Sequence, residues 1–190
     1  SERHMMQEMF TSAARPFYHS ADMLELKAIA PEIYIPFIIG HFEKRNRRIA
    51  SADVERVYNL FKGHTYYIQK TFNEAFADTS EGEECTLETL RAAIDNMIAA
   101  NDTIFREILS NIPERQKELL YAIAKEGEAE RMSSAAFIKR HSLASSSSVQ
   151  SAMKKLLEKD IITEINKVFS VTDKLFAMWI NGIYGNRFQL

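Results

Sequence analysis

The sequence contains little of what cross-links, breaks or anchors a polypeptide. Its 190 residues include one cysteine, four prolines and six glycines. A single cysteine cannot form an internal disulfide bond, which favours a reducing, cytoplasmic compartment. No apolar run approaches the roughly 18 residues of a membrane-spanning helix, and no signal-peptide pattern opens the chain. We therefore expect a cytoplasmic protein that has no membrane partner and folds through packing of its core.

Short motifs of catalysis and phosphate binding are missing as well. The sequence has no G-x-x-x-x-G-K-[ST] phosphate loop, no G-x-S-x-G and no H-E-x-x-H. Its five histidines are scattered without the spacing of metal ligands, so we expect ordinary surface or boundary positions for them. Cys85 lies among acidic residues, which raise the pKa of a thiol, so we do not expect a nucleophile there. The sequence of this chain alone therefore indicates no catalytic residue, no metal site and no enzymatic activity.

The formal net charge of −2 conceals a division of the chain. Residues 113–190 contain twelve Lys/Arg and nine Asp/Glu, whereas residues 1–112 contain twelve Lys/Arg and seventeen Asp/Glu. The second part is therefore positive by three charges and the first part negative by five. Such a surplus is compatible with nucleic acid but is far below that of a strongly basic binding domain. The change of sign suggests a domain boundary close to Pro113, with each part large enough to bury a core.

The segment from Pro113 onward has the element order of a winged helix-turn-helix domain. Pro113 suits the first turn of a helix over 114–125, and a Ser133 cap precedes a second helix over 134–141. The serine run at 145–148 can cap a third helix, because serine oxygens accept from the free N–H groups of a first turn. The short link between the second and third helices is then the turn of the motif.

A hairpin and a closing helix complete this pattern. Two β-branched runs at 161–165 and 168–172 are separated by Asn166-Lys167, a two-residue turn in which asparagine tolerates positive φ. Asp173 can cap the last helix. The order of three helices and a hairpin predicts a winged helix with a lysine at the tip of its small β-hairpin.

Four helices are expected between residues 31 and 110, which makes the chain mainly α-helical. Pro31 starts the first helix, and the basic cluster 44–48 closes it, where positive charge suits the macrodipole. The side chains expected to face inward on this helix are Ile33, Tyr34, Phe37, Ile38 and Phe42. A solvated helix end is preferred for the cluster over a phosphate-binding patch.

The other three helices follow from caps and apolar stripes. Ser51 caps the second helix, which stops at Gly63, and the third covers residues 64–77. An acidic loop follows at 78–85. Thr86 then caps a long fourth helix, whose apolar stripe continues to Ile108.

The first residues predict a segment that needs a partner surface. Residues 1–10 have an amphipathic pattern, with an apolar face made of Met5, Met6, Met9 and Phe10. The mixed run at 17–26 favours a strand. Because such an apolar face rarely stays open, we expect the first thirty residues to be mobile, folded back on the helices that follow, or paired with a second copy in a homodimer.

Three blocks of sequence carry a resemblance to a known family. They are Arg15 to Asp22 (RPFYHSAD), Gly63 to Gln69 (GHTYYIQ) and Ser146 to Ala152 (SSSVQSA), and they occur in the family's order. Together they resemble the C-terminal part of archaeal-type P-loop ATPases of the AAA+/STAND group. The resemblance implies a remnant of the ATPase core at 1–29, a helical-bundle lid at 30–112 and the winged helix-turn-helix at 113–190.

The resemblance also implies where nucleotide would be contacted. Ser1 would lie near the sensor position that faces the γ-phosphate, and Gly63, His64 and Thr65 match the family's Gly-x-Pro-Tyr element. ATP and Mg²⁺ would be bound by the core of a full-length parent, so no tight nucleotide binding is expected for this chain alone. Thr65 stands in place of the family's proline, so the resemblance does not extend to a contact with the adenine ring. From the residues alone, Gly63 is equally well explained as the C-cap of one helix before the next.

The winged helix offers a polar surface for a macromolecular partner. The residues expected on this surface are Ser147, Gln150, Ser151, Lys154 and Lys155 on the third helix and Lys167 at the wing tip. Serine and glutamine can reach phosphates or base edges, and lysines release counterions. Nearby Glu158, Asp160 and Glu164 weaken the positive field, so duplex DNA and a protein partner both remain open.

Two functions are consistent with the sequence. The first is a fragment of an ATP-binding P-loop ATPase whose missing N-terminal core is its main partner. The lid would close over the nucleotide, and the winged helix would relay that state to a partner or to DNA. The alternative is a stand-alone winged-helix transcriptional regulator that binds DNA and has a helical dimerisation or sensing domain. A phosphate loop encoded immediately upstream of Ser1 would decide between them.

Overall fold

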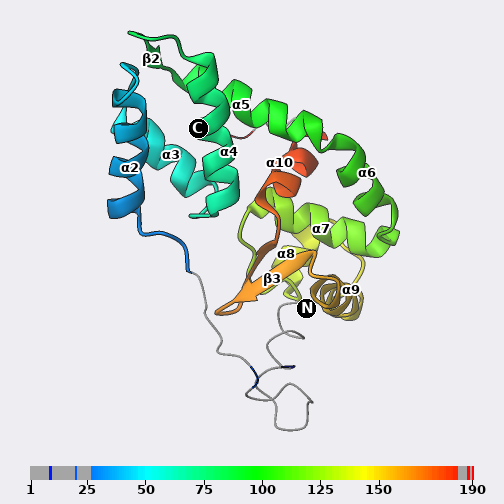
Figure 1. Cartoon of the computed structure of the whole chain (residues 1–190). Helices are drawn as coiled ribbons and strands as arrows, with labels where there is room; N and C mark the ends of the chain where they lie inside the picture. Colours follow the sequence, from blue (N-terminus) through cyan, green and yellow to red (C-terminus); the bar gives the residue numbers. More distant parts are fainter. Residues whose placement is uncertain (1–8, 10–19, 21–26, 184–187, 189) are drawn as a thin grey trace. The chain divides into compact units, whose positions relative to one another are not determined.

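A computed structural model describes residues 27–183 together with Met9, Ser20, Phe188 and Leu190. The described chain is mainly α-helical, as predicted, with a small antiparallel hairpin (Figure 1). It divides between Asp102 and Thr103 into two compact units. We call residues 27–102 the bundle unit and residues 103–183 the winged-helix unit. Within the described residues, none of the helices combines the length and apolar character needed to cross a membrane.

Four helices and two very short strands form the bundle unit. The helices are α2 (Pro31–Glu43), α3 (Ser51–Leu60), α4 (Thr65–Asp78) and α5 (Leu87–Ala100). The strands β1 (Arg48–Ile49) and β2 (Glu84–Cys85) pair in parallel. Helix α2 packs on α3, and α4 packs on α5. Among the fully buried side chains that hold this unit together are Val54, Val57, Ile68, Leu90 and Ile94.

The basic cluster at 44–48 is largely the predicted solvated helix end: Lys44 is the C-cap of α2, and of the five residues only Arg47 is half-buried, the others being exposed. Helix α2 already ends at Glu43, and Arg48 belongs to β1. The Arg47 guanidinium lies 4.0 Å above the Phe76 ring, and its Nε donates to the Thr79 carbonyl. The expected acidic loop at 78–85 contains β2, which pairs with β1. Contacts between segments distant in sequence therefore organise this cluster, with Arg47 as a packed residue.

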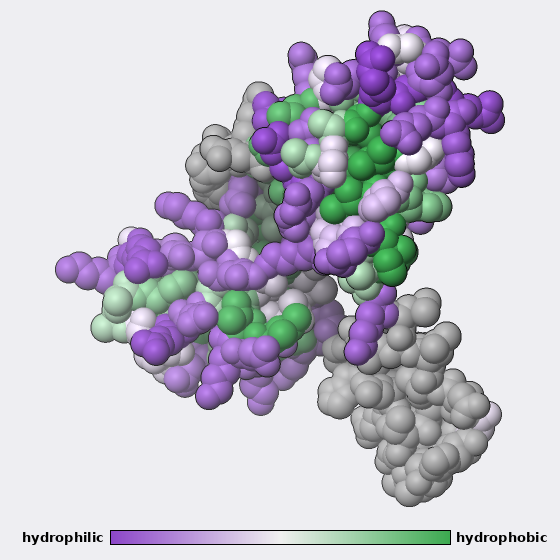
Figure 2. Space-filling view, turned by 90° about the vertical axis from the view of Figure 1, so that its left-hand side faces the viewer, coloured by the Kyte–Doolittle hydropathy of each residue, from purple (hydrophilic) through white to green (hydrophobic). Residues whose placement is uncertain are grey.

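The prediction of which α2 side chains face inward was wrong for two of the five residues. Tyr34, Ile38 and Phe42 are buried, whereas Ile33 is 68% and Phe37 56% exposed. The buried three recur every four residues, and the exposed pair forms the neighbouring row of the same helix. The view of Figure 2, taken from the side where α2 lies in Figure 1, shows hydrophobic residues gathered in one area over the bundle unit. The helix is thus more apolar than its packing within the unit requires.

Helix starts in the bundle unit agree with the sequence in one case and differ in another. The Thr86 hydroxyl accepts from the backbone N–H of Thr89, as the predicted cap requires. Ser51 is not a cap, because Ala50 occupies that position and Ser51 is the first helical residue. The prediction of one long fourth helix was also wrong. Asn101 follows α5, and a separate helix, α6 (Asp102–Ser110), begins immediately after it.

The interruption after α5 coincides with the division between the units. The Asn101 side-chain amide donates to the Met97 carbonyl at 2.8 Å, which ends the preceding helix. Helix α6 then packs within the winged-helix unit, where the Phe105 ring lies 5.2 Å from Phe176 and 5.8 Å from Trp179. The division therefore falls upstream of Pro113, where charge had suggested a boundary.

The winged-helix unit has the predicted order of elements. After α6 come α7 (Glu114–Glu126), α8 (Ala135–Arg140), α9 (Ser146–Glu158), β3 (Ile162–Ile165), β4 (Val168–Val171) and α10 (Lys174–Ile183). The two strands are antiparallel, with Ile162 opposite Val171. Ala129 exchanges two backbone hydrogen bonds with Phe169 and so adds a third short segment to this sheet. Leu119, Leu120, Ile123, Leu156, Leu175 and Ile180 form its buried centre.

Local signals in this unit act largely as the sequence predicts. The Ser145 hydroxyl accepts from the backbone N–H of Ser148 and caps α9. Asn166 and Lys167 have φ of 53° and 66°, the left-handed values that a tight two-residue hairpin turn requires. The cap of α8 was assigned one residue too early, because Ser134, not Ser133, accepts from the first turn.

Candidate functional sites

The turn between α3 and α4 contains three of the four residues proposed for nucleotide contact. Gly63 has φ of 76°, and its N–H donates to the Tyr58 carbonyl at 3.1 Å. His64 donates to the Phe61 carbonyl at 3.0 Å. This arrangement closes the C-terminus of α3 and leads directly into α4. Ser1, the fourth residue, lies outside the described residues.

The space beside Gly63 is occupied by the chain itself. A Cβ atom at this position would lie 2.9 Å from Ala28 Cβ and 2.9 Å from Tyr58 Oη. The Tyr58 hydroxyl in turn donates to the Ile29 carbonyl at 2.7 Å. Glycine is therefore required here by internal packing and by its positive φ. The C-cap explanation accounts for Gly63, and nucleotide contact by it stays a prediction.

His64 and Thr65 are more accessible than Gly63 to a ligand. His64 is exposed at the N-cap of α4, and its ring centroid lies 4.8 Å from that of Tyr67. Thr65 is half-buried at the first helical position. Among the described residues of this first turn none is acidic, so the positive end of the helix dipole is not offset locally. The position is chemically suitable for an anion, although a helix N-terminus alone does not identify one.

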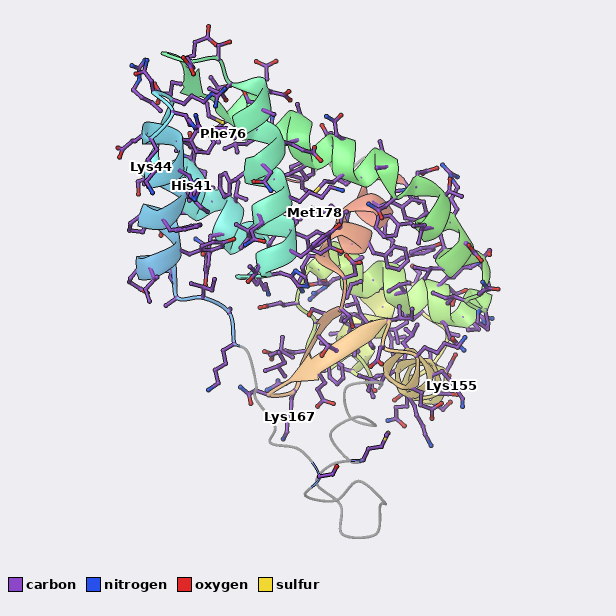
Figure 3. All side chains as sticks on the ribbon, in the orientation of Figure 1. His41, Lys44, Phe76, Lys155, Lys167 and Met178 are labelled. Carbon is purple, nitrogen blue, oxygen red and sulfur yellow. The ribbon has the colours of Figure 1, made fainter. Side chains whose placement is uncertain are left out.

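The second candidate site is the outer side of α9 with the wing tip. Ser147, Gln150, Ser151, Lys154, Lys155 and Lys167 are all exposed. Val149, Ala152 and Leu156 face the core from the opposite side of α9. In Figure 3, Lys155 extends from α9 and Lys167 from the end of the hairpin, both away from the body of the unit. The structure therefore places all six predicted contact residues on accessible surface.

Carboxylates reduce the positive charge of this surface. Lys155 Nζ lies 2.8 Å from Glu158 Oε2, and this hydrogen bond lowers the pKa of Glu158. Glu164 is exposed on β3. An exposed ion pair of this kind contributes little to stability but partly neutralises the lysine for an incoming phosphate. Lys154 and Lys167 are therefore better placed than Lys155 to meet a polyanion.

A neighbouring groove adds a residue that the sequence did not suggest. Its volume is about 670 Å³, and its walls come from the 130–134 loop, Met153 of α9 and the hairpin. Arg131, an exposed residue with φ of 48°, lines it together with Lys167, Glu130 and Glu164. Arg131 was missed because its loop had no predicted element. Its proximity to Lys167 arises only when the sheet forms.

The turn of the helix-turn-helix is held by an electrostatic contact to α7. Glu126 Oε1 lies 3.0 Å from Arg140 Nη1 and 2.8 Å from His141 Nε2. Both hydrogen bonds lower the pKa of the Glu126 carboxyl. The imidazole also lies 4.4 Å from the Phe137 ring. These contacts join the C-terminal end of α8 to the C-terminal end of α7.

Cys85 is the second residue of β2 and is buried. Burial raises the pKa of its thiol, and Asp53 and Glu84 add to this increase, while a hydrogen bond with Thr79 partly offsets it. The direction agrees with the sequence, but burial contributes more than the acidic neighbours. In the part of the chain that the structure describes, no three His, Cys, Asp or Glu side chains cluster as metal ligands would.

Comparison with known proteins adds two findings. Residues 103–182 match the family described as a probable winged helix domain. The chain is similar in structure to the Walker-type ATPase of Pyrococcus abyssi, with a TM-score of 0.63 and 12% sequence identity. This likeness covers 95% of the present chain and 49% of that protein, so the chain spans about half the length of the ATPase. A search of curated proteins gives no significant match.

The two findings bear on different parts of the prediction. The family match lies within the winged-helix unit and confirms the predicted domain type. The structural likeness confirms the resemblance to a P-loop ATPase at the level of the fold, because sequence identity this low carries no functional detail. Residues 103–182 are therefore a winged helix domain, and the chain shares its fold with an archaeal Walker-type ATPase.

Proposed function

We propose that the chain is the lid and winged-helix part of a P-loop ATPase of the AAA+/STAND group. The observation that supports this is the fold likeness to a Walker-type ATPase over 95% of the chain. ATP and Mg²⁺ would be bound by a core that supplies the phosphate loop missing from this sequence. The bundle unit would close over the nucleotide, and the winged helix would relay the bound state to a partner.

The lid's own contribution comes from His64 and Thr65. The N–H groups and dipole of the α4 N-terminus favour negative charge. Because Ala28 and Tyr58 already fill the space beside Gly63, the nucleotide would approach the two residues that follow it. The role of Gly63 is then to shape the turn.

A substitution at Thr65 tests this role in the polypeptide that includes the upstream reading frame. That frame is expected to encode a phosphate loop, and its absence would refute the proposal. Thr65→Pro restores the family's residue at a first helical position, which tolerates proline. We expect it to tighten Mg-ATP binding in calorimetry, and His64→Ala to weaken it. Ser51→Pro, at the first position of α3, is the matched control and should leave ATP affinity unchanged.

A chain without the core provides a second check. Residues 1–190 contain no phosphate loop, so titration with Mg-ATP should show no micromolar binding. Tight binding by this chain alone would mean that its nucleotide site lies elsewhere.

Size-exclusion chromatography of the same sample tests the proposed homodimer, which should be lost when residues 1–26 are deleted.

Duplex DNA is the second candidate partner, and the polar outer side of α9 favours it. Ser147, Gln150 and Ser151 are exposed there, and α9 has no acidic residue before Glu158. Lys154 and Lys167 would contact phosphates, so replacing each with alanine should weaken binding at every sequence and reduce the salt slope by about 0.9 per phosphate contact. Gln150→Ala should instead relax any base preference.

Electrophoretic mobility shifts at about 50 mM salt measure this binding, because non-specific affinity is highest at low salt. Lys139→Ala, an exposed lysine on α8, serves as the control for loss of charge alone. If the wild-type chain causes no shift, the relay goes to a protein, and the DNA-binding regulator alternative is excluded.

A further inference from the structure

The groove between α2 and α4 of the bundle unit has the size and composition of a small-molecule site. Its volume is about 410 Å³, within the range of roughly 300–1,000 Å³ that such sites occupy. The side chains used below are Tyr34, Phe37 and His41 from α2 and Gln69, Asn73 and Phe76 from α4. Figure 3 marks His41 and Phe76 on these two helices.

A buried hydroxyl lies in the wall of this groove without a partner. Tyr34 is 2% exposed, and among the described residues its Oη has no hydrogen-bond partner. Burial raises the pKa of the Tyr34 hydroxyl, and the neighbouring Gln69 side chain offsets part of this rise. A buried O–H group without an acceptor costs free energy, which a ligand oxygen or nitrogen in the groove would recover.

Aromatic side chains form most of the groove walls. Phe37 and His41 form an edge-to-face pair at 4.8 Å, and the Phe42 and Phe76 rings pair similarly at 5.2 Å. Of the described side chains that line the groove, none is Lys, Arg, Asp or Glu. These walls suit a flat ring and give no compensation for a phosphate or carboxylate.

Two amide side chains define the polar edge of the groove. Gln69 and Asn73 lie four residues apart on α4 and therefore share one face of the helix. Both are exposed and both line the groove. Each amide carries a donor and an acceptor, which matches a heteroaromatic ring edge that presents N–H next to a ring nitrogen.

We infer that the α2–α4 groove binds an uncharged, planar heteroaromatic molecule whose ring nitrogen or carbonyl oxygen accepts a hydrogen bond from the Tyr34 hydroxyl. The ring lies against Phe37 and Phe76, and its polar edge meets Gln69 and Asn73. This site is separate from the proposed nucleotide contact at His64 and Thr65, because it offers no group for a phosphate. Failure of either proposal therefore leaves the other intact.

Two isosteric probes test the inference. 7-Azaindole carries a ring-nitrogen acceptor, and indole has the same shape without it. Titrated into the ¹⁵N-labelled full chain, both should shift backbone amides of α2 and α4 beside the groove. A neutral hydrogen bond is worth about 0.5–1.5 kcal/mol, so 7-azaindole should bind about two- to tenfold more tightly than indole.

Tyr34→Phe separates hydrogen bonding from shape. It removes the hydroxyl and keeps the ring, so the fold is retained and the preference for 7-azaindole should disappear. The control is Tyr66→Phe, which removes an exposed hydroxyl of α4 that does not line the groove. This variant should keep the preference for 7-azaindole. Phe37→Ala should weaken both probes.

Three results would overturn the inference. The first is the absence of saturable amide chemical-shift changes with either probe at millimolar concentration. In that case the groove would instead bind apolar side chains of a protein partner. The second is a set of shifts outside α2 and α4. The third is an undiminished preference for 7-azaindole in Tyr34→Phe.

Discussion

Helices α2 and α9 both have 13 residues, but the exposed side of α2 carries large apolar residues and that of α9 is polar. Each buries one stripe, made of Tyr34, Ile38 and Phe42 in α2 and of Val149, Ala152 and Leu156 in α9. The outer side of α9 is composed of serine, glutamine and lysine, whereas α2 exposes Ile33 and Phe37. Water stabilises the first arrangement, and covering by another apolar surface would stabilise the second.

The N-termini of the two helices also differ in their polar contacts. Ser145 caps α9 with a side-chain hydrogen bond, while α2 begins after Ala30, whose methyl group cannot accept one. The outer surface of α9 is therefore stable in contact with water and suited to a polar partner. The surface of α2 is suited to contacts that displace water.

The largest expected effect contrasts a buried with an exposed apolar residue. Leu156→Ala should lower the free energy of unfolding by about 2–5 kcal/mol, because it removes a fully buried side chain and leaves a cavity. Ile33→Ala should change it by less than about 0.5 kcal/mol, since Ile33 is mostly exposed. Chemical denaturation measures both. A large loss from Ile33→Ala would show that α2 is already covered in solution.

An intermediate effect is expected at the helix caps. Ser145→Ala removes the acceptor for the Ser148 N–H and should cost about 1 kcal/mol. Ala30→Ser supplies the missing acceptor to α2 and should raise stability by up to about the same amount. Thermal unfolding of the two variants should show melting temperatures that move in opposite directions. Equal shifts of the same sign would contradict the assigned difference.

The smallest effect concerns the turn that precedes α9. The pKa of Glu126 is lowered in the folded chain, so its contribution is present above the ordinary glutamate pKa of 4.5. This contribution should be lost as the pH falls below 4.5 through the lowered value. Glu126→Gln should therefore reduce stability at pH 7 slightly and flatten its decline below pH 4.5.

Urea denaturation across this pH range measures the Glu126 contribution. Glu130→Gln, an exposed glutamate in the same unit, is the control and should preserve the wild-type decline. An unchanged slope in Glu126→Gln would mean that Arg140 and His141 do not stabilise the folded state through this carboxylate.

Much of the winged-helix unit was predictable because its signals are local. A serine cap, a two-residue turn at Asn166-Lys167 and an aspartate before the last helix each act within a few residues. The polar outer side of α9 also followed directly from helical periodicity. Arg131 was not predictable, because it joins Lys167 only through pairing of the sheet.

The bundle unit was predicted less completely. Apolar residues occur on several sides of α2, so periodicity could not decide which row is buried. The break at Asn101 was missed because the apolar stripe continues across it. The side chain of Asn101 ends α5, and Phe105 then packs on Phe176 and Trp179.

The sequence by itself determined the helical class, the helix-turn-helix order, the wing turn and the accessible polar residues of α9. These depend on spacing and on hydrogen bonds within one turn. Only the tertiary structure decided that Arg47 packs on Phe76, that the space beside Gly63 is filled by Ala28, and that Tyr34 keeps a buried hydroxyl in a groove. Each of these brings together groups from separate segments, and their contacts depend on the packed arrangement of the helices.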